Sequence, residues 1–110
     1  MNLAAYYEAV SDIRGESFTE KEFSARYLGK SATYYAYLKC TRSEPSKTAL
    51  IHLWQQLKRD TDAYAQWAES SGVRWLAEDY KRRSWRLKGL CGALLQDIMW
   101  ASQSCVREEL

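Results

Sequence analysis

A long series of apolar residues in the C-terminal third of the chain can share one face only if the backbone is helical. Leu76 and Tyr80 begin the series, and the later members alternate spacings of four and three: Leu87, Cys91, Leu94, Ile98, Ala101 and Cys105. This heptad-like spacing is typical of a helix that packs along its length against another helix. We therefore expect helix from about residue 73 almost to the C-terminus, weakened at Gly89 and Gly92.

Shorter amphipathic segments precede this helix. Apolar spacing predicts a first helix over residues 2–13, which Gly15 ends. A second pattern over residues 47–59, opened by Pro45 or Ser46, repeats at i, i+3, i+4 and i+7 through Leu50, Leu53, Trp54 and Leu57. The composition changes after Asp60, so residues 61–70 are expected to form another helix, broken near Ser70, Ser71 and Gly72. With five glycines and one proline in 110 residues, an all-α fold is expected.

Two short helices are expected between these segments. Thr19 is followed three residues later by Glu22, which is the spacing of a capping box, and Gly29 ends the helix that follows. Ser31 is expected to cap the next helix, over residues 32–40, in which Tyr35 and Leu38 fall on one side.

The cysteines and the hydropathy limit the cellular setting. Cys40, Cys91 and Cys105 are odd in number, widely spaced and without a CxxC pair, so neither a disulfide framework nor a zinc site is expected. They are expected to be buried as small hydrophobic residues. The N-terminus does not resemble a signal peptide, and no run approaches the ~18 apolar residues of a membrane span. We expect a cytoplasmic protein without membrane contact.

Catalytic patterns are missing from the sequence. His52 is the only histidine and has a structural role by expectation, because acid–base or metal chemistry needs partners. Glu78 and Asp79 are neighbours on a helix and point in different directions. The sequence contains no GxSxG, P-loop or HExxH pattern. We expect no enzymatic activity, no metal and no cofactor.

Residues 18–57 carry the most informative pattern, FTEKEFSARYLGKSATYYAYLKCTRSEPSKTALIHLWQQL. A threonine-led helix with Glu and an apolar residue is followed by a turn glycine, a serine-capped helix, a loop ending in Pro-Ser and an apolar helix. The positions are Thr19, Glu22, Phe23, Gly29, Ser31, Pro45, Ser46, Leu50, Leu53 and Leu57. This pattern resembles the lambda-repressor-like, or Xre-like, helix-turn-helix family over about forty residues. Glycine suits the positive φ of the turn, and Ser24 and Ala25 are small enough for close helix contact.

The sequence departs from the family pattern at three points. The spacing from Ser24 to Gly29 is one residue longer than usual, and Thr41 stands where many members have glycine. The expected recognition helix also lacks Arg, Gln and Asn, the commonest side chains that read bases.

The resemblance implies sequence-specific binding of double-stranded DNA by a transcriptional regulator, in a bacterium, phage or plasmid. The outward residues of the recognition helix would lie in the major groove, and the flanking cations would contact phosphates. The candidate DNA-binding residues are Lys30, Ser31, Ala32, Thr33, Tyr34, Tyr37, Lys39, Arg42 and Lys47. The net charge of +2 neither requires nor excludes nucleic acid.

The C-terminal half contains a second basic cluster and four of the five tryptophans. The basic residues Arg74, Lys81, Arg82, Arg83, Arg86 and Lys88 form either a solvated helix face or a second phosphate-binding surface above Trp85. The apolar series could fold back on the same chain or pair with a second copy. Four tryptophans are more than a monomer of this size normally hides, which favours a homodimer: Trp67, Trp75, Trp85 and Trp100.

These patterns together predict a compact helix-turn-helix bundle followed by a C-terminal helical extension, either a hairpin or one long helix. Residues 1–60 would form the DNA-binding domain, and residues 61–110 a helical region for dimerisation. The alternative is a small helical protein-interaction module, such as an antiactivator or phage-type inhibitor, that keeps the fold without binding DNA.

Overall fold

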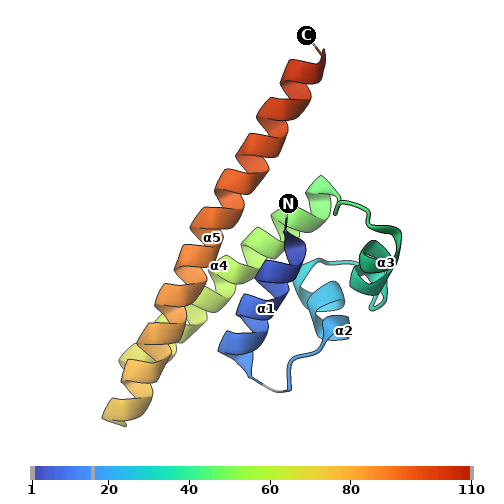
Figure 1. The fold of residues 1–110 in the computed structure, drawn as a ribbon. Helices are drawn as coiled ribbons and strands as arrows, with labels where there is room; N and C mark the ends of the chain where they lie inside the picture. Colours follow the sequence, from blue (N-terminus) through green and yellow to red (C-terminus); the bar gives the residue numbers. More distant parts are fainter. Residues whose placement is uncertain (1, 16, 110) are drawn as a thin grey trace.

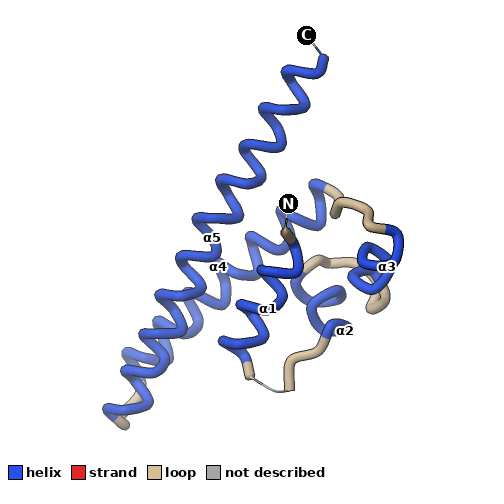
Figure 2. Tube along the Cα trace, viewed as in Figure 1, coloured by secondary structure: helices blue, strands red, loops and turns tan. Residues whose placement is uncertain are grey.

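A computed structural model describes residues 2–15 and 17–109, and every regular element within these ranges is helical (Figures 1 and 2). The side chains from residue 101 onward lie outside the described part. The elements are α1 (Leu3–Arg14), α2 (Glu20–Glu22), the π-helical turn η1 (Phe23–Tyr27), α3 (Tyr34–Thr41), α4 (Lys47–Ser70) and α5 (Arg74–Glu109). The expected all-α class is confirmed.

The two longest helices, α4 and α5, form an antiparallel hairpin that gives the molecule its 55 Å length. The chain reverses at residues 71–73, where the predicted break lies. Ser84 on α5 donates a hydrogen bond at 2.9 Å to the carbonyl of Thr61 on α4, which fixes the register. Since α5 is 36 residues long and α4 only 24, the C-terminal end of α5 projects beyond its partner (Figure 1).

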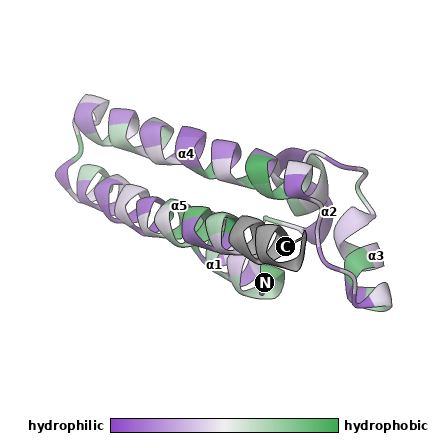
Figure 3. Ribbon diagram, turned by 90° about the horizontal axis from the view of Figure 1, so that it is seen from above, coloured by the Kyte–Doolittle hydropathy of each residue, from purple (hydrophilic) through white to green (hydrophobic). Residues whose placement is uncertain are grey.

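The remaining helices form the head of the molecule: η1 packs against α4, α1 packs against α5, and α2 and α3 pack against η1. Viewed from above, α1 lies along α5 while α3 lies at the end of the hairpin (Figure 3). The core joins the head to the hairpin, and its completely or almost completely buried residues are Val10, Ile13, Phe23, Tyr27, Leu28, Ala49, Leu53, Leu57, Leu87 and Leu94. A compact helix-turn-helix bundle followed by a helical hairpin is therefore the observed architecture.

The apolar series on α5 folds back on its own chain. Leu87 and Leu94 are fully buried, and Cys91 and Ile98 pack against the same core. The side chains of the last two members, Ala101 and Cys105, lie outside the described residues. This series therefore covers α4 and α1 within one chain and, as far as Ile98, leaves no seam for a second copy.

Polar bonds fasten α1 to α5. The hydroxyl of Tyr6 donates to Asp97 at 2.6 Å, and Arg83 donates to the carbonyl of Ile13 at 2.8 Å. Arg86 binds Asp12 at 3.0 Å. Two members of the C-terminal basic cluster thus hold the head on the hairpin.

One expected helix boundary and one expected buried residue are wrong. The predicted break after Asp60 is missing, because α4 continues to Ser70. Asp60 is buried and accepts a hydrogen bond from Gln56, so the polar residue that marks the change of composition faces the core. The regions 1–60 and 61–110 therefore share one helix. Cys40, expected to be buried, is exposed on α3.

Candidate nucleic-acid interface

The segment from α2 to α3 has the geometry of two short helices joined by a turn. The hydroxyl of Thr19 accepts a hydrogen bond from the backbone N–H of Glu22 at 3.2 Å, as a capping box requires. The side chain of Glu22 does not return to Thr19. It contacts Arg14 at 3.3 Å and Arg26 at 3.6 Å, so only half of the box forms.

The π-helical turn η1 explains the extra residue between Ser24 and Gly29. The backbone N–H of Leu28 bonds the carbonyl of Phe23 at 3.0 Å, five residues earlier. A π turn holds one residue more than the corresponding α turn. The insertion is thus absorbed within the helix, and Phe23, Ser24 and Tyr27 still face the core.

Gly29 and His52 form the floor of the turn. The φ of Gly29 is +66°, and a Cβ at this position would lie 2.7 Å from Cδ2 of His52. Nδ1 of His52 lies 3.0 Å from the carbonyl oxygen of Tyr27, at hydrogen-bonding distance. The predicted turn glycine is confirmed, and His52 contributes to the packing of the turn.

Ser24 holds the start of α3 from outside that helix. Its hydroxyl is buried and accepts a hydrogen bond from the backbone N–H of Tyr35 at 2.9 Å. The first N–H groups of a helix have no partner within it, so this bond acts as a cap. The cap expected from Ser31 does not form, because α3 begins at Tyr34 and the carbonyl of Ser31 closes a preceding turn. Ala25, expected at the same contact, is exposed.

The inner face of α3 matches the sequence prediction. Tyr35 and Leu38 are buried, and the ring of Tyr35 contacts those of Tyr7 and Phe23, with centroids 5.3 Å apart in both pairs. Aromatic contacts of this kind add to the energy of burial. The helix is therefore fixed against both η1 and α1.

The outer face of α3 is partly different from the expectation. Ala32, Thr33 and Tyr37 are exposed, and Tyr37 has 59 % of its surface accessible. Tyr34 is half-buried, and its hydroxyl accepts a hydrogen bond from the N–H of Ser46 at 3.1 Å. Tyr34 therefore ties α3 to the start of α4 instead of pointing outward.

The four predicted phosphate-binding cations differ in the contacts that they make within the chain. Lys39 binds Glu20 of α2, at 2.7 Å to Oε1, and this hydrogen bond raises the pKa of its ammonium. Lys30 lies 5.9 Å from the ring centre of Tyr34. Arg42 and Lys47 are exposed, and neither has an ion pair with any described residue. The structure therefore leaves Arg42 and Lys47 available to an anion.

Arg42 follows the last residue of α3, where the resembled pattern expects a glycine. Its φ is +53°, in the left-handed region, and its N–H bonds the carbonyl of Leu38. The sequence comparison pointed to Thr41, one residue earlier, which still belongs to α3. A side chain at positive φ is strained relative to glycine.

The α5 basic cluster does not lie above a packed tryptophan. Trp85 is 80 % exposed, which contradicts its predicted position beneath the cations. Arg83 pairs with Asp79 at 2.9 Å in addition to its bond to α1. Arg74 is exposed and pairs with Glu78 at 3.7 Å, and Lys81, Arg82 and Lys88 are exposed.

Three contacts of the interface could not be read from local sequence. The pairs Ser24–Tyr35, Glu20–Lys39 and Tyr34–Ser46 join residues 11, 19 and 12 positions apart. No periodicity marks them, because each depends on how the helices pack. The position of Glu20 in the first turn of a helix did not indicate that it would pair with Lys39.

The fold defines a class: an all-α protein with a head of short helices on a long helical hairpin. The model of DUF6626, described as a family of unknown function, matches residues 14–107, and the chain belongs to this family. No curated protein and no solved structure matches the chain. Within residues 2–15 and 17–109, no helix has both the length and the apolar character needed to cross a bilayer.

Proposed function

We propose that the chain is a DNA-binding transcriptional regulator that inserts α3 into the major groove. One observation carries the proposal. Buried contacts from η1 and α1 fix α3 in place, while its outer face stays uncovered, with Lys30 before it and Arg42 after it. A rigid, exposed helix with cations at both ends suits the groove and its two phosphate backbones.

The roles of the side chains follow from their positions. Lys30, Arg42 and Lys47 contact phosphates, which positions the head without reading sequence. Thr33 and Tyr37 are exposed and can hydrogen-bond a base edge or touch a thymine methyl group. Since α3 begins at Tyr34, residues 30–33 form the loop before α3 and not the first turn of that helix. In the proposed complex this loop lies at the edge of the major groove.

A regulator of this class acts in the cytoplasm of a bacterium, or in a phage or plasmid context, as the family resemblance implies. Such proteins bind paired half-sites as dimers, which matches the two-fold symmetry of their operators. The proposal includes no enzymatic step and no metal or cofactor.

A protein-interaction module is the second candidate, and the Glu20–Lys39 pair favours it. This pair removes one cation from the outer face and leaves a carboxylate beside it. Tyr37 and the neighbouring small residues then resemble a protein-binding surface more than a base-reading one.

The test is binding of the full chain to the DNA upstream of its own gene, titrated with salt against a scrambled fragment. A preference for the upstream DNA that persists with rising salt supports specific binding. Lys30→Ala with Arg42→Ala should weaken binding to both fragments and reduce the salt slope by about 2. Tyr37→Ala should instead change the preference between fragments.

Lys81→Ala with Arg82→Ala provides the matched control, since it removes two exposed cations from α5. An effect of this control equal to that of the α3 pair would transfer phosphate binding to α5. No binding to either fragment at low salt would reject the DNA proposal and favour the protein-interaction module.

A further inference from the structure

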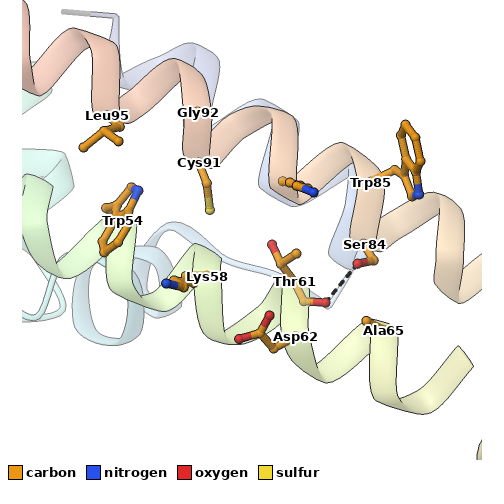
Figure 4. Close-up of a pocket in the computed structure, with 11 residues that line it drawn as sticks. Trp54, Lys58, Thr61, Asp62, Ala65, Ser84, Trp85, Cys91, Gly92 and Leu95 are labelled. Carbon is orange, nitrogen blue, oxygen red and sulfur yellow. Dashed lines mark hydrogen bonds between the residues drawn. The ribbon is translucent and has the colours of Figure 1, made fainter. Parts of the chain in front are cut away.

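An apolar groove of about 530 Å³ runs between α4 and α5 (Figure 4). Trp54, Thr61 and Ala65 line it from α4, and Cys91 and Leu95 line it from α5. Trp54 and Leu95 point toward each other across it, and the Ser84–Thr61 hydrogen bond lies at its floor. A groove between two antiparallel helices has the shape that another helix fills.

The α5 edge of this groove carries a second regular series, separate from the buried one. Trp85, Lys88, Gly92, Leu95 and Met99 alternate spacings of three and four residues. Trp85, Leu95 and Met99 are 80, 43 and 56 % exposed. Regular spacing of this kind aligns with a neighbouring helix along its length.

The same series contains one large exposed side chain, Trp85, and one residue without a side chain, Gly92. Trp85 projects from α5 away from α4 (Figure 4), whereas a Cβ added at Gly92 would meet nothing within 4 Å. In an antiparallel pairing of two α5 helices about an axis near Lys88 and Gly89, each Trp85 lies opposite the other copy's Gly92. A two-fold interface requires such a self-complementary patch.

The charges of the groove also complement a second copy. Lys58 and Asp62 on α4 and Lys88 on α5 all line it, and none of the three has an ion pair with a described residue. Two copies related by a two-fold axis bring both signs to the interface, so Asp62 of each copy can pair with a lysine of the other. A groove lined by one sign alone would favour a different partner.

The exposed area is sufficient for a dimer. Trp85, Leu95, Met99 and the open side of Trp54 expose on the order of 400 Å² of apolar side chain. A standard interface buries about 800 Å² per partner, and slightly more than half of that area is apolar. The groove and its edge therefore offer the apolar area that one half of a standard interface needs.

We propose that the groove between α4 and α5 binds the same groove of a second copy, with Trp85 of each chain seated at Gly92 of the other, to form a four-helix dimer. This surface differs from the buried series of Leu87 and Leu94. Dimerisation through it does not require DNA, and its failure would leave DNA binding by the head untouched.

The test is sedimentation equilibrium of the full chain without DNA. The wild-type chain should be a dimer at tens of micromolar, and Trp85→Ala should raise the dissociation constant about tenfold or more. Trp75→Ala is the matched control, because Trp75 is 70 % exposed on α5 but does not line the groove. It should change the constant less than twofold.

A second variant tests the gap directly. Gly92→Leu should favour the α5 helix and yet weaken the dimer, since it fills the space that Trp85 needs. Ala93→Leu, at the next and exposed position, should leave the dimer unchanged. A wild-type monomer at 100 µM (about the upper limit of the assay range), or equal effects of the variants and their controls, would overturn the proposal.

Discussion

The hydroxyl of Ser24 in η1 caps α3 by accepting the backbone N–H of Tyr35 at 2.9 Å. The cap therefore comes from the preceding helix and not from the residue before α3. This bond couples the two helices of the turn, because α3 would lose a partner for a buried N–H if it moved away from η1.

Ser24→Ala should lower the free energy of unfolding by about 1–3 kcal/mol, since it leaves that buried N–H without an acceptor. Ser31→Ala should change the free energy of unfolding by less than about 0.5 kcal/mol, because Ser31 is exposed and lies outside the helix. Urea denaturation of the two variants makes the comparison. A larger loss for Ser31→Ala would mean that α3 is capped locally, as the sequence alone indicates.

The sequence gives local features reliably and long-range ones poorly. Thr19 and Ser46 cap their helices as local spacing predicts, and Gly29 has the positive φ that its place in the turn requires. These features depend on three or four consecutive residues. The cap from Ser24 and the Glu20–Lys39 pair depend on how separate helices pack, which no local pattern records.

The continuity of α4 through Asp60 also depends on long-range contacts that the local sequence does not record. Asp60 marks a change of composition and yet lies in the core, where it accepts from the hydroxyl of Tyr27 and lies 3.7 Å from Arg14. The sequence does not show which residues pair with a buried polar group. Without those partners, a polar residue in an apolar helix looks like a boundary. Here the partners come from η1 and α1, and together they make a buried polar cluster possible.

Arg42→Gly should separate stability from DNA binding. Glycine removes the strain of a side chain at φ +53°, so the free energy of unfolding should rise by about 0.5–1 kcal/mol. The same change removes one phosphate contact and should reduce the salt slope of DNA binding by about 1. Thermal denaturation and a salt titration measure the two effects. Arg42→Ala is the control, because it removes the charge and keeps the strain.

Glu20→Gln should strengthen DNA binding severalfold. It removes a carboxylate beside α3 and releases Lys39, whose ammonium is now held by that carboxylate. Lys39→Met should have little effect in the wild-type chain but should cancel the gain in the Glu20→Gln background, as a double-mutant cycle by fluorescence anisotropy would show. Glu69→Gln, an exposed change at the far end of α4, is the control for charge alone. Equal gains from both glutamine variants would exclude a specific role for Lys39.

The stability of the head should decrease in alkali because of Tyr27. Burial, followed by the hydrogen bond to Asp60, raises the pKa of its hydroxyl above the usual value near 10. The folded state therefore keeps a proton that the unfolded state loses, so the contribution of Tyr27 is complete below about pH 10 and falls as the pH rises further. The loss should approach 1.4 kcal/mol (about tenfold in the folding equilibrium) for each pH unit above that point.

Tyr27→Phe should lower the free energy of unfolding by about 1–3 kcal/mol at pH 7, because Asp60 and Arg14 both lose a buried partner. The variant should also lose less stability than the wild-type chain between pH 10 and 11, since it lacks one hydroxyl that ionises there only in the unfolded state. Folding raises the pKa of Tyr6 and Tyr35 as well, so the variant still loses part of its stability in alkali. Tyr37→Phe should leave both properties unchanged, as Tyr37 is 59 % exposed. Urea denaturation at pH 7, 10 and 11 distinguishes the cases, and parallel pH profiles for wild type and Tyr27→Phe would show that the Tyr27 hydroxyl does not govern alkaline unfolding.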